Sequence, residues 1–407
     1  MSESSVQTTE RLQRMIDAGG HVVVPPGALV VRTLHLRSGV TFEIPHDATL
    51  LAHRNNAAFD RQERLPWETH ADVETSDFAH AVLVGRDLER VAIVGAGAIR
   101  MDRAIRWGPK PIALRGCADV RVAGIAIHGA PNYSVSLGGC TDVVVEGVTI
   151  RDALSDGIDP DSCRRVRIVD CDIESDDDAI CVKSSLFMGR PLPCEDVEVL
   201  RCRTRSGTNG FKIGTETSGP VTRVLVADCT FDARPRPGRD PRLADLHDLH
   251  EAGGVSIQTV DGADVTDIVV ERVRIEHARG PIAVRRGARG RGQPEPRPGV
   301  LRNVVLRDIE ATGTRETASI AGVPGAPVED MVLERVSIDA LGGGERMNDP
   351  VPECEDAYPQ CTMFGPLPAW GLYARHVDGL ALRDLRCTAQ TPDERDMLVL
   401  DDVTLVD

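Results

Sequence analysis

The sequence predicts an all-β fold, a single right-handed parallel β-helix of roughly ten coils with a short N-terminal helical cap and long loops. Three observations lead to this prediction. Short β-branched runs recur along the 407 residues, one motif returns with a period in the low twenties, and apolar residues alternate with polar ones inside each run. A single turn of this kind cannot bury its own apolar face, so neighbouring turns stack and share a core. We therefore expect one domain over residues 1–407.

The chain begins with the one stretch that has a helical pattern, residues 8–18. Residues 1–20 are therefore expected to form a cap that covers the end of the stack. This segment has no positively charged start followed by an apolar block, so no export signal is seen. Together with 11 cysteines, an odd number without a metal-binding spacing, this predicts a cytoplasmic protein with free thiols.

The repeat is clearest around Cys117, Cys140, Cys163 and Cys194, each of which stands just before a β-branched run. The first two steps between these cysteines are equal, and the third is longer. The alternation in residues 120–127 turns every second side chain inward. We therefore expect the cysteines to form an interior column of small apolar side chains rather than a metal site or disulfides.

The charge of the chain limits its partners. The formal net charge is −16, which disfavours binding to nucleic acid or to anionic lipid. No apolar run is long enough to span a membrane. Neither partner is therefore expected, and the oligomeric state stays open. The cations are nearly all arginines, and the three lysines, Lys110, Lys183 and Lys212, stand out for that reason.

Four insertions interrupt the repeat, at residues 184–192, 233–252, 286–299 and 340–370. Insertions in a solenoid emerge as loops, often around a binding face. The last one carries Tyr358, Phe364 and Trp370. It is interpreted either as a wall of a sugar pocket near the site, with Trp370 as a binding residue, or as a loop that packs against the side of the stack.

Acidic residues in two repeats are predicted to meet. One period beyond Asp156 is position 179, next to Asp178, and the following, longer step leads from Asp178 to Asn209. One period before Asp156 is Tyr133. Because adjacent strands lie about 4.8 Å apart, Asp156, Asp177 and Asp178 should lie within one sugar ring of each other. The alternative is that these residues only end strands at turns.

Clustered carboxylates have a specific chemical use. Like charges this close raise the pKa of at least one group, which provides a proton donor beside an ionised base. Glycosidic bonds are cleaved by such pairs, with inversion when the carboxyl groups are roughly 6.5–9.5 Å apart and retention at about 5 Å. Catalytic roles are therefore expected for Asp156, Asp177 and Asp178.

Further residues near the same phase are candidates for substrate binding. Three of them, Lys183, Lys212 and Glu216, follow the acidic segments in the sequence. Asn209 lies one coil above the Asp177–Asp178 pair. Tyr133 lies one coil below Asp156, where it could stack on a sugar face. Trp107 and the pair His250–Glu251 are additional candidates, the latter as a proton relay.

Several segments together resemble the polygalacturonase family, glycoside hydrolase family 28. They are residues 22–27, 40–42, 156–159, 177–180 and 209–214, and the spacing from Asp156 to Asp177 fits the same family. The resemblance implies a right-handed parallel β-helix and hydrolysis with inversion. Asp177 would be the general acid, and Asp156 and Asp178 would activate the water. No metal or organic cofactor is implied.

The chain departs from the family pattern in three places. Leu154-Ser155-Asp156 stands where the family has Asn-Thr-Asp, and Thr208-Asn209-Gly210 replaces a His between glycines. Ser256-Ile257-Gln258 replaces the Arg-Ile-Lys that grips a uronate carboxylate. The loss of these cations argues against ordinary polygalacturonan as the substrate, unless Lys212 or an arginine such as Arg285 substitutes for them. The departures favour a divergent bacterial branch that acts in the exo mode on a galacturonide, a rhamnoside or another neutral sugar, with the 348–370 insertion closing one end of the groove.

Two other functions stay open at this point. A β-helix lyase or epimerase would use Lys183 or Lys212 as a base and the 176–178 run as Ca²⁺ ligands. A carbohydrate-binding solenoid without activity is the other alternative, because a fold alone does not establish chemistry.

Overall fold

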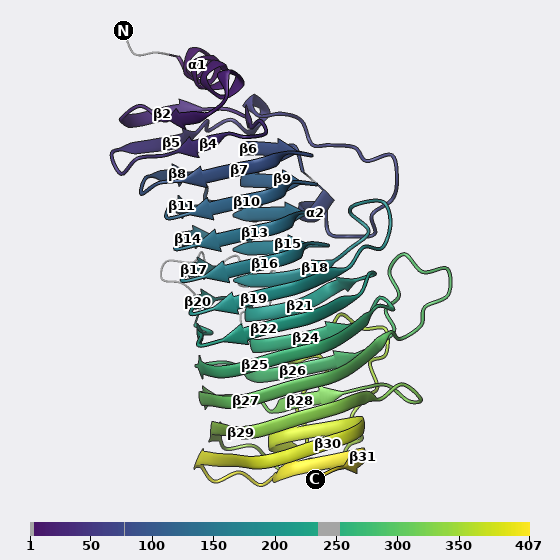
Figure 1. The fold of residues 1–407 in the computed structure, drawn as a ribbon. Coiled ribbons are helices and arrows are strands. Elements are labelled where there is room, and N and C mark those ends of the chain that lie inside the picture. The colour runs from purple at the N-terminus through teal and green to yellow at the C-terminus, as the bar shows by residue number, and fades with distance from the viewer. Residues whose placement is uncertain (1–3, 77, 235–252) are drawn as a thin grey trace.

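The computed structural model, which describes residues 4–76, 78–234 and 253–407, is a right-handed parallel β-helix. Figure 1 shows the strands stacked from the N-terminus to the C-terminus, which confirms the predicted fold class. The strands of the described residues belong to one continuous sheet, with parallel pairing from coil to coil. The strands of successive coils form three ladders, and in the C-terminal coils one long strand runs through two of them. The third ladder runs through about twelve coils, slightly more than expected.

The three ladders follow one another along the chain in every coil. The first ladder consists of β1 (His21–Val23), β4 (Thr41–Glu43), β7 (Glu89–Val94), β10 (Ala118–Ala123), β13 (Thr141–Glu146), β16 (Arg164–Val169), β19 (Cys194–Leu200) and β22 (Val221–Ala227). The second consists of β2 (Gly27–Val31), β5 (Ala48–Ala52), β8 (Ala98–Arg100), β11 (Ala126–His128), β14 (Thr149–Ala153), β17 (Asp172–Ser175), β20 (Arg203–Ser206) and β23 (Thr230–Asp232). The long strands β25 (Asp264–Glu276), β27 (Val300–Thr314) and β29 (Val328–Gly342) continue both ladders.

The third ladder carries the turns that matter for function. It consists of β3 (Leu34–His35), β6 (Ala81–Arg86), β9 (Lys110–Arg115), β12 (Val135–Gly138), β15 (Ile158–Asp161), β18 (Ile180–Ser184), β21 (Asn209–Thr217), β24 (Gly253–Thr259), β26 (Gly280–Arg286), β28 (Ala318–Ala321), the start of β30 (Ala369–Thr391), and β31 (Asp396–Leu405). The remaining part of β30 continues the other two ladders.

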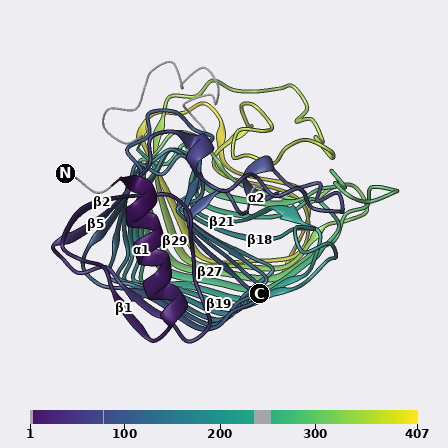
Figure 2. The same ribbon diagram turned by 90° about the horizontal axis from the view of Figure 1, so that it is seen from above.

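The N-terminal cap is the helix α1 (Ser5–Ala18), close to the predicted segment. Ser4 begins it, since its hydroxyl accepts a hydrogen bond from the backbone N–H of Gln7. Leu12 and Ile16 are fully buried and join the core at the end of the stack. Figure 2 shows the helix lying across that end. Within the described residues, no helix has the length and apolar character needed to cross a membrane.

The cysteine column is confirmed. Cys117, Cys140, Cys163 and Cys194 are buried in successive coils, and the thiol of Cys163 donates to the carbonyl of Asp161 at 3.3 Å. All 11 cysteines of the chain lie in described segments, and all are free thiols. The column therefore fills the interior with small side chains, and no cross-link contributes to the fold.

The repeated motif also has a structural cause at the turns. Asp142, Arg165, Asp196 and Arg223 stand at the same position of successive coils, each with φ between 53° and 58°. Arg165 donates to both carboxylate oxygens of Asp142, at 2.6 and 2.8 Å, and Arg223 pairs with Asp196 in the same way. These pairs are half exposed, so solvent screens them and each contributes little to stability. Opposite charges on alternate coils nevertheless avoid a column of like charges.

The long loops leave the stack on either side of the third ladder. Residues 185–193, 287–299 and 343–368 connect strands where insertions were predicted. Of the 233–252 insertion, residues 235–252, and with them His250 and Glu251, lie outside the described residues. A further insertion between β5 and β6 was missed. It separates the paired residues Leu34 and Leu83 by about two periods, and it carries the 3₁₀ turn η1 (Asn56–Ala58) and the short helix α2 (Val73–Ser76).

The burial of the thiols can be tested directly. In the folded protein, only Cys354 and Cys387 are expected to react rapidly with a thiol reagent, because the other nine cysteines are buried. Unfolding in denaturant without reductant should make all 11 reactive. A spectrophotometric titration before and after unfolding measures both numbers. Fewer reactive thiols after unfolding than the chain has cysteines would show that disulfides exist and that the column is cross-linked.

Candidate active site

Three carboxylates converge at the turns that lead into the third ladder. Asp156 lies two residues before the start of β15, and Asp177 and Asp178 lie just before β18. Ile158 pairs with Ile180, so Asp156 and Asp178 occupy equivalent positions in adjacent coils. One oxygen from each of the three side chains lies within 4.8 Å of the others. The structure thus brings these residues together as the repeat arithmetic predicted.

Asp178 is held by a complete set of donors from the coil above. The ammonium group of Lys212 donates to Oδ2 at 2.8 Å. Thr208 Oγ1 and Asn209 Nδ2 both donate to Oδ1, at 2.7 and 2.6 Å. The carboxylate is buried, and these hydrogen bonds fix its orientation.

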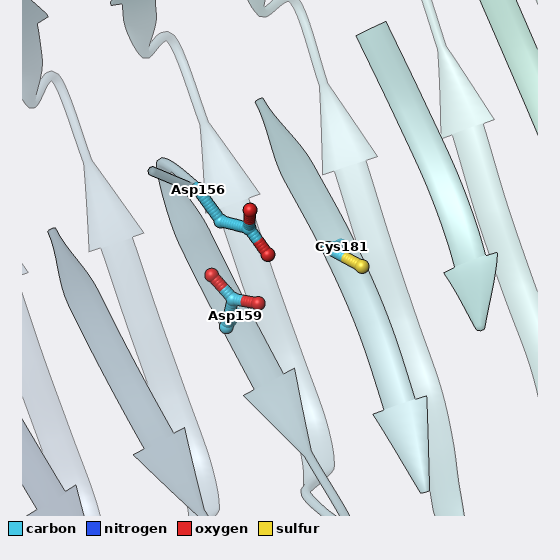
Figure 3. Close-up of side chains that lie close together, drawn as sticks. All are labelled: Asp156, Asp159 and Cys181. Carbon is cyan, nitrogen blue, oxygen red and sulfur yellow. The ribbon is translucent and has the colours of Figure 1, made fainter. Parts of the chain in front are cut away.

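Asp156 lies in a second buried network, together with Asp159. Figure 3 shows the two carboxyl groups turned toward each other, with the Cys181 thiol on the neighbouring strand. Lys183 Nζ lies 3.1 Å from Asp156 and 2.9 Å from Asp159, and it also donates to the Tyr133 hydroxyl at 2.7 Å. Burial raises the pKa of Asp156, and the charge of Asp159 raises it further. Burial also raises the pKa of Asp159. This pair therefore holds a proton more firmly than an exposed aspartate.

Asp177 differs from the other two because solvent reaches it. Its side chain is 20% exposed and lines a cleft, whereas those of Asp156 and Asp178 are 5% and 4% exposed. Arg106 Nη2 lies 2.7 Å from Asp177, and Arg106 Nε donates to Glu74 at 2.6 Å. Asp177 also accepts hydrogen bonds from Thr208 Oγ1 and from the backbone N–H of Asp178. Of the three acids, Asp177 is thus the most accessible to a bound molecule.

The cleft over Asp177 has a volume of about 440 Å³, within the range of small-molecule sites. Three loops from distant parts of the sequence form it. α2 and the preceding Asp72 contribute one wall, the loop with Arg106 and Trp107 another, and residues 358–361 a third. Thr208, Asn209 and Lys212 complete the lining. In Figure 2, α2 lies on the same side of the stack as β18 and β21.

Comparison with known proteins finds similar sequences and structures. Residues 68–234, which include the three acids, match the family model described as glycosyl hydrolases family 28. A curated "probable polygalacturonase" from Vitis vinifera is 23% identical over 347 residues, covering 79% of this chain and 67% of that protein.

Solved structures of the same family share the fold. A family 28 exopolygalacturonase from Yersinia enterocolitica superposes with a TM-score of 0.71 at 11% identity, covering 97% of this chain and 75% of that one. An exopolygalacturonase from Thermotoga maritima gives a TM-score of 0.69 at 16% identity, covering 96% and 89%.

The match over residues 68–234 makes the chain polygalacturonase-like and indicates a glycoside hydrolase. The alternatives of a lyase and of a solenoid without activity do not agree with this assignment. The three acids are also poorly suited to bind a metal cation. Lys183, Lys212 and Arg106 each lie within 3.1 Å of one of the three catalytic candidates, so a Ca²⁺ ion would have to compete with three positive charges.

At the positions where the sequence departs from the family motifs, other side chains make specific hydrogen bonds. Asn209 stands where the family has a His, and it donates to Asp178. Gln258 was predicted to replace the family lysine, and its Nε2 donates to Ser256 Oγ at 2.6 Å and to the carbonyl of Pro359 at 3.1 Å. Gln258 therefore anchors the loop that forms one wall of the cleft.

The residues predicted to bind substrate fall into three groups. Asn209 and Lys212 line the cleft. Lys183 and Glu216 are buried behind it, where they support other side chains. The prediction that Tyr133 stacks on a sugar is wrong, because Tyr133 is 3% exposed and its ring faces Lys183, whose Nζ lies 4.1 Å from the ring centroid.

The prediction for Trp370 is also wrong. β30 begins at Ala369, so Trp370 belongs to a strand of the third ladder and not to the loop. That strand lies five steps beyond β18, or about 24 Å at the usual strand spacing. The aromatic residue of the 340–370 insertion that does reach the cleft is Tyr358, whose hydroxyl lies 3.5 Å from Lys212 Nζ. Trp107, 59% exposed, lines the opposite wall.

Several functional residues were missed, namely Asp72, Glu74 and Arg106. They lie on loops without the repeat, so period arithmetic does not place them. The available signal was the double-length gap between β3 and β6, which indicates an insertion of about one coil.

Glu216 supports the wall behind the cleft. It is 3% exposed, it shares a hydrogen bond with Asp72, and Arg291 Nη1 lies 3.4 Å from its carboxylate. Burial raises the pKa of Glu216 to about 7, against the attraction of Lys183 and Arg289. Glu216 therefore keeps its proton to a higher pH than an exposed glutamate does.

This pKa predicts a pH-dependent stability. Between pH 4.5 and 7 the folded state binds more protons at Glu216 than the unfolded state, so its contribution falls as pH rises. Glu216→Gln keeps the neutral form at all pH values. The stability of the variant relative to the wild type should rise by roughly 2–3 kcal/mol from pH 5 to pH 8. Urea unfolding at several pH values measures this, with exposed Glu310→Gln as the control. A difference that stays constant with pH contradicts the assignment.

Proposed function

We propose that this chain is an inverting exo-glycosidase that removes a terminal sugar from a pectin-related oligosaccharide or a small glycoside. The observation that carries the proposal is the unequal access to the three acids. Asp177 is open to the cleft, while Asp156 and Asp178 lie behind it in fixed positions. Acid–base cleavage needs one group that meets the leaving oxygen and others that hold a water.

Asp177 is assigned as the general acid. A glycosidic oxygen in the cleft can approach Asp177, and a closely bound sugar would exclude water from its carboxyl group. Arg106 lies beside it, but its charge is shared with Glu74 at a similar distance. The contacts from Thr208 and the Asp178 backbone fix the direction in which the carboxyl group points.

Asp156 and Asp178 are assigned to the water. The ion pairs with Lys183 and Lys212 hold the two carboxyl groups in adjacent coils, and a water between them would lie next to the anomeric carbon of a sugar bound above. The oxygens lie within 4.8 Å, closer than the roughly 6.5–9.5 Å typical of a two-carboxyl inverting pair. Inversion is therefore supported by the family motif and not by the spacing.

The exo mode is supported by the loops. The α2 segment and residues 358–361 both border the cleft, which favours a pocket for a chain end over an open groove. The Gln258 contact to Pro359 holds the second loop in place. The solved relatives from Yersinia enterocolitica and Thermotoga maritima are named exopolygalacturonases, which agrees with this mode.

The roles of the acids predict the effect of substitution. Asp177→Asn and Asp178→Asn should each lower kcat by roughly 10²–10⁴-fold, because the proton donor or the water-holding base is lost. Thermal unfolding should show that both variants stay folded. Asp172→Asn, an exposed residue on the same coil that pairs with Arg151, is the matched control. Wild-type rates for either variant on a cleaved substrate would remove that residue from the mechanism.

The course of the reaction predicts the first product. Proton NMR during cleavage of a pectin oligosaccharide should show a single monosaccharide released from one end, with the anomeric configuration opposite to that of the bond cleaved. Chromatography of early products should contain no fragments of intermediate size. Retained configuration would instead indicate a covalent intermediate, and mixed fragments would indicate endo action.

A further inference from the structure

The cations that line the cleft are already neutralised. Among the residues that the structure describes, the lining includes Arg106 and Lys212 as its cations. Arg106 lies 2.6 Å from Glu74 and 2.7 Å from Asp177, so it contacts two carboxylates at once. Lys212 lies 2.8 Å from Asp178, and its side chain is 7% exposed. Neither offers an unshared positive charge to a ligand.

Glu74 has the decisive position beside Arg106. It is 3% exposed and also accepts a hydrogen bond from Ser155 Oγ at 3.2 Å. A ligand carboxylate that approached Arg106 would therefore meet Glu74 and Asp177 at short range. The charge of Arg106 cannot satisfy a third anion without loss of one of these contacts.

The opposite wall offers no cation either among its described residues. Where the family motif has Arg and Lys, the sequence comparison above assigns Ser256 and Gln258. Gln258 Nε2 donates to Ser256 Oγ and to the carbonyl of Pro359 in the loop. Both side chains are buried beneath that loop. Asp72, also in the lining, is acidic, and its own cation, Arg291 at 3.0 Å, is not among the lining residues. The lining thus includes three carboxylates, those of Asp72, Glu74 and Asp177, against two cations.

We propose that the cleft selects an uncharged terminal sugar, a hexose or deoxyhexose rather than a hexuronic acid, and that Glu74 sets this selectivity by occupying Arg106. The inference rests on the proposed glycosidase function and makes it more specific. Trp107 and Tyr358 fit this preference, because aromatic rings at the cleft favour the C–H faces of a neutral sugar over a charged group.

The test uses substrates that differ only in charge. Oligogalacturonides are compared with the same oligosaccharides after their carboxyl groups have been reduced to alcohols, and with a rhamnose-terminated pectin fragment. Release of the terminal sugar gives kcat/KM for each. We expect the value for an uncharged terminus to exceed that for the uronate by roughly tenfold or more. A wild-type preference for the uronate overturns the inference and leaves the glycosidase function intact. Failure to cleave any of the three overturns the proposed function itself.

A variant separates the role of Glu74 from that of general fold stability. Glu74→Gln frees part of Arg106, so the ratio of uronate to neutral activity should rise by roughly fivefold or more. The control is Glu63→Gln on the same insertion, which pairs with Arg86 and Arg115 outside the cleft and should leave the ratio unchanged. An unchanged ratio in folded Glu74→Gln removes Glu74 as the selector. If that variant unfolds, the wild-type ratio still decides the inference.

Discussion

The site depends on the parallel register of the third ladder, which stacks like charges on adjacent coils. Because Ile158 pairs with Ile180, Asp156 and Asp178 occupy equivalent positions in adjacent coils. Their two carboxyl groups are therefore close together in a buried part of the protein. Such an arrangement is unfavourable unless cations compensate it. Lys183 and Lys212 provide that compensation, one within each network. Burial alone would lower the pKa of Lys183, but the neighbouring carboxylates raise it, so the ammonium group stays charged.

This constraint accounts for the lysines of an otherwise arginine-rich chain. All three lysines are buried at or next to the site. Lys110 donates to the backbone carbonyl of Glu74 and so holds α2 against the stack, while the other two hold the acids. An ammonium group is a compact charge that fits between side chains in adjacent strands, whereas a planar guanidinium needs more room. Arg106 and Arg291 occur instead where loops meet and space is larger.

The sequence predicted the parts of the molecule that follow its period. The cysteine column and the meeting of Asp156 with Asp178 follow from counting residues between repeats, and the cap follows from the one helical pattern in the chain. The same counting placed Tyr133 at the correct coil, but it fixes a backbone position and not the direction of a side chain, which here faces Lys183. Glu74, Arg106 and Tyr358 reach the cleft from insertions, whose paths depend on contacts between distant residues. No local pattern encodes those contacts.

The division between coils and insertions has a consequence for how the site can change. The coils fix the positions of the three acids, whereas the loops that border the cleft determine which substrate reaches them. Coils and loops are connected through Arg106, which contacts both Glu74 in α2 and Asp177. A change in the α2 loop that alters sugar recognition therefore also changes the electrostatic surroundings of the proposed acid. Tyr358 is less coupled, because it reaches Asp178 only through Lys212. Substitutions in the wall formed by residues 358–361 can thus change the size of the substrate that fits, with the least effect on the electrostatic surroundings of Asp177.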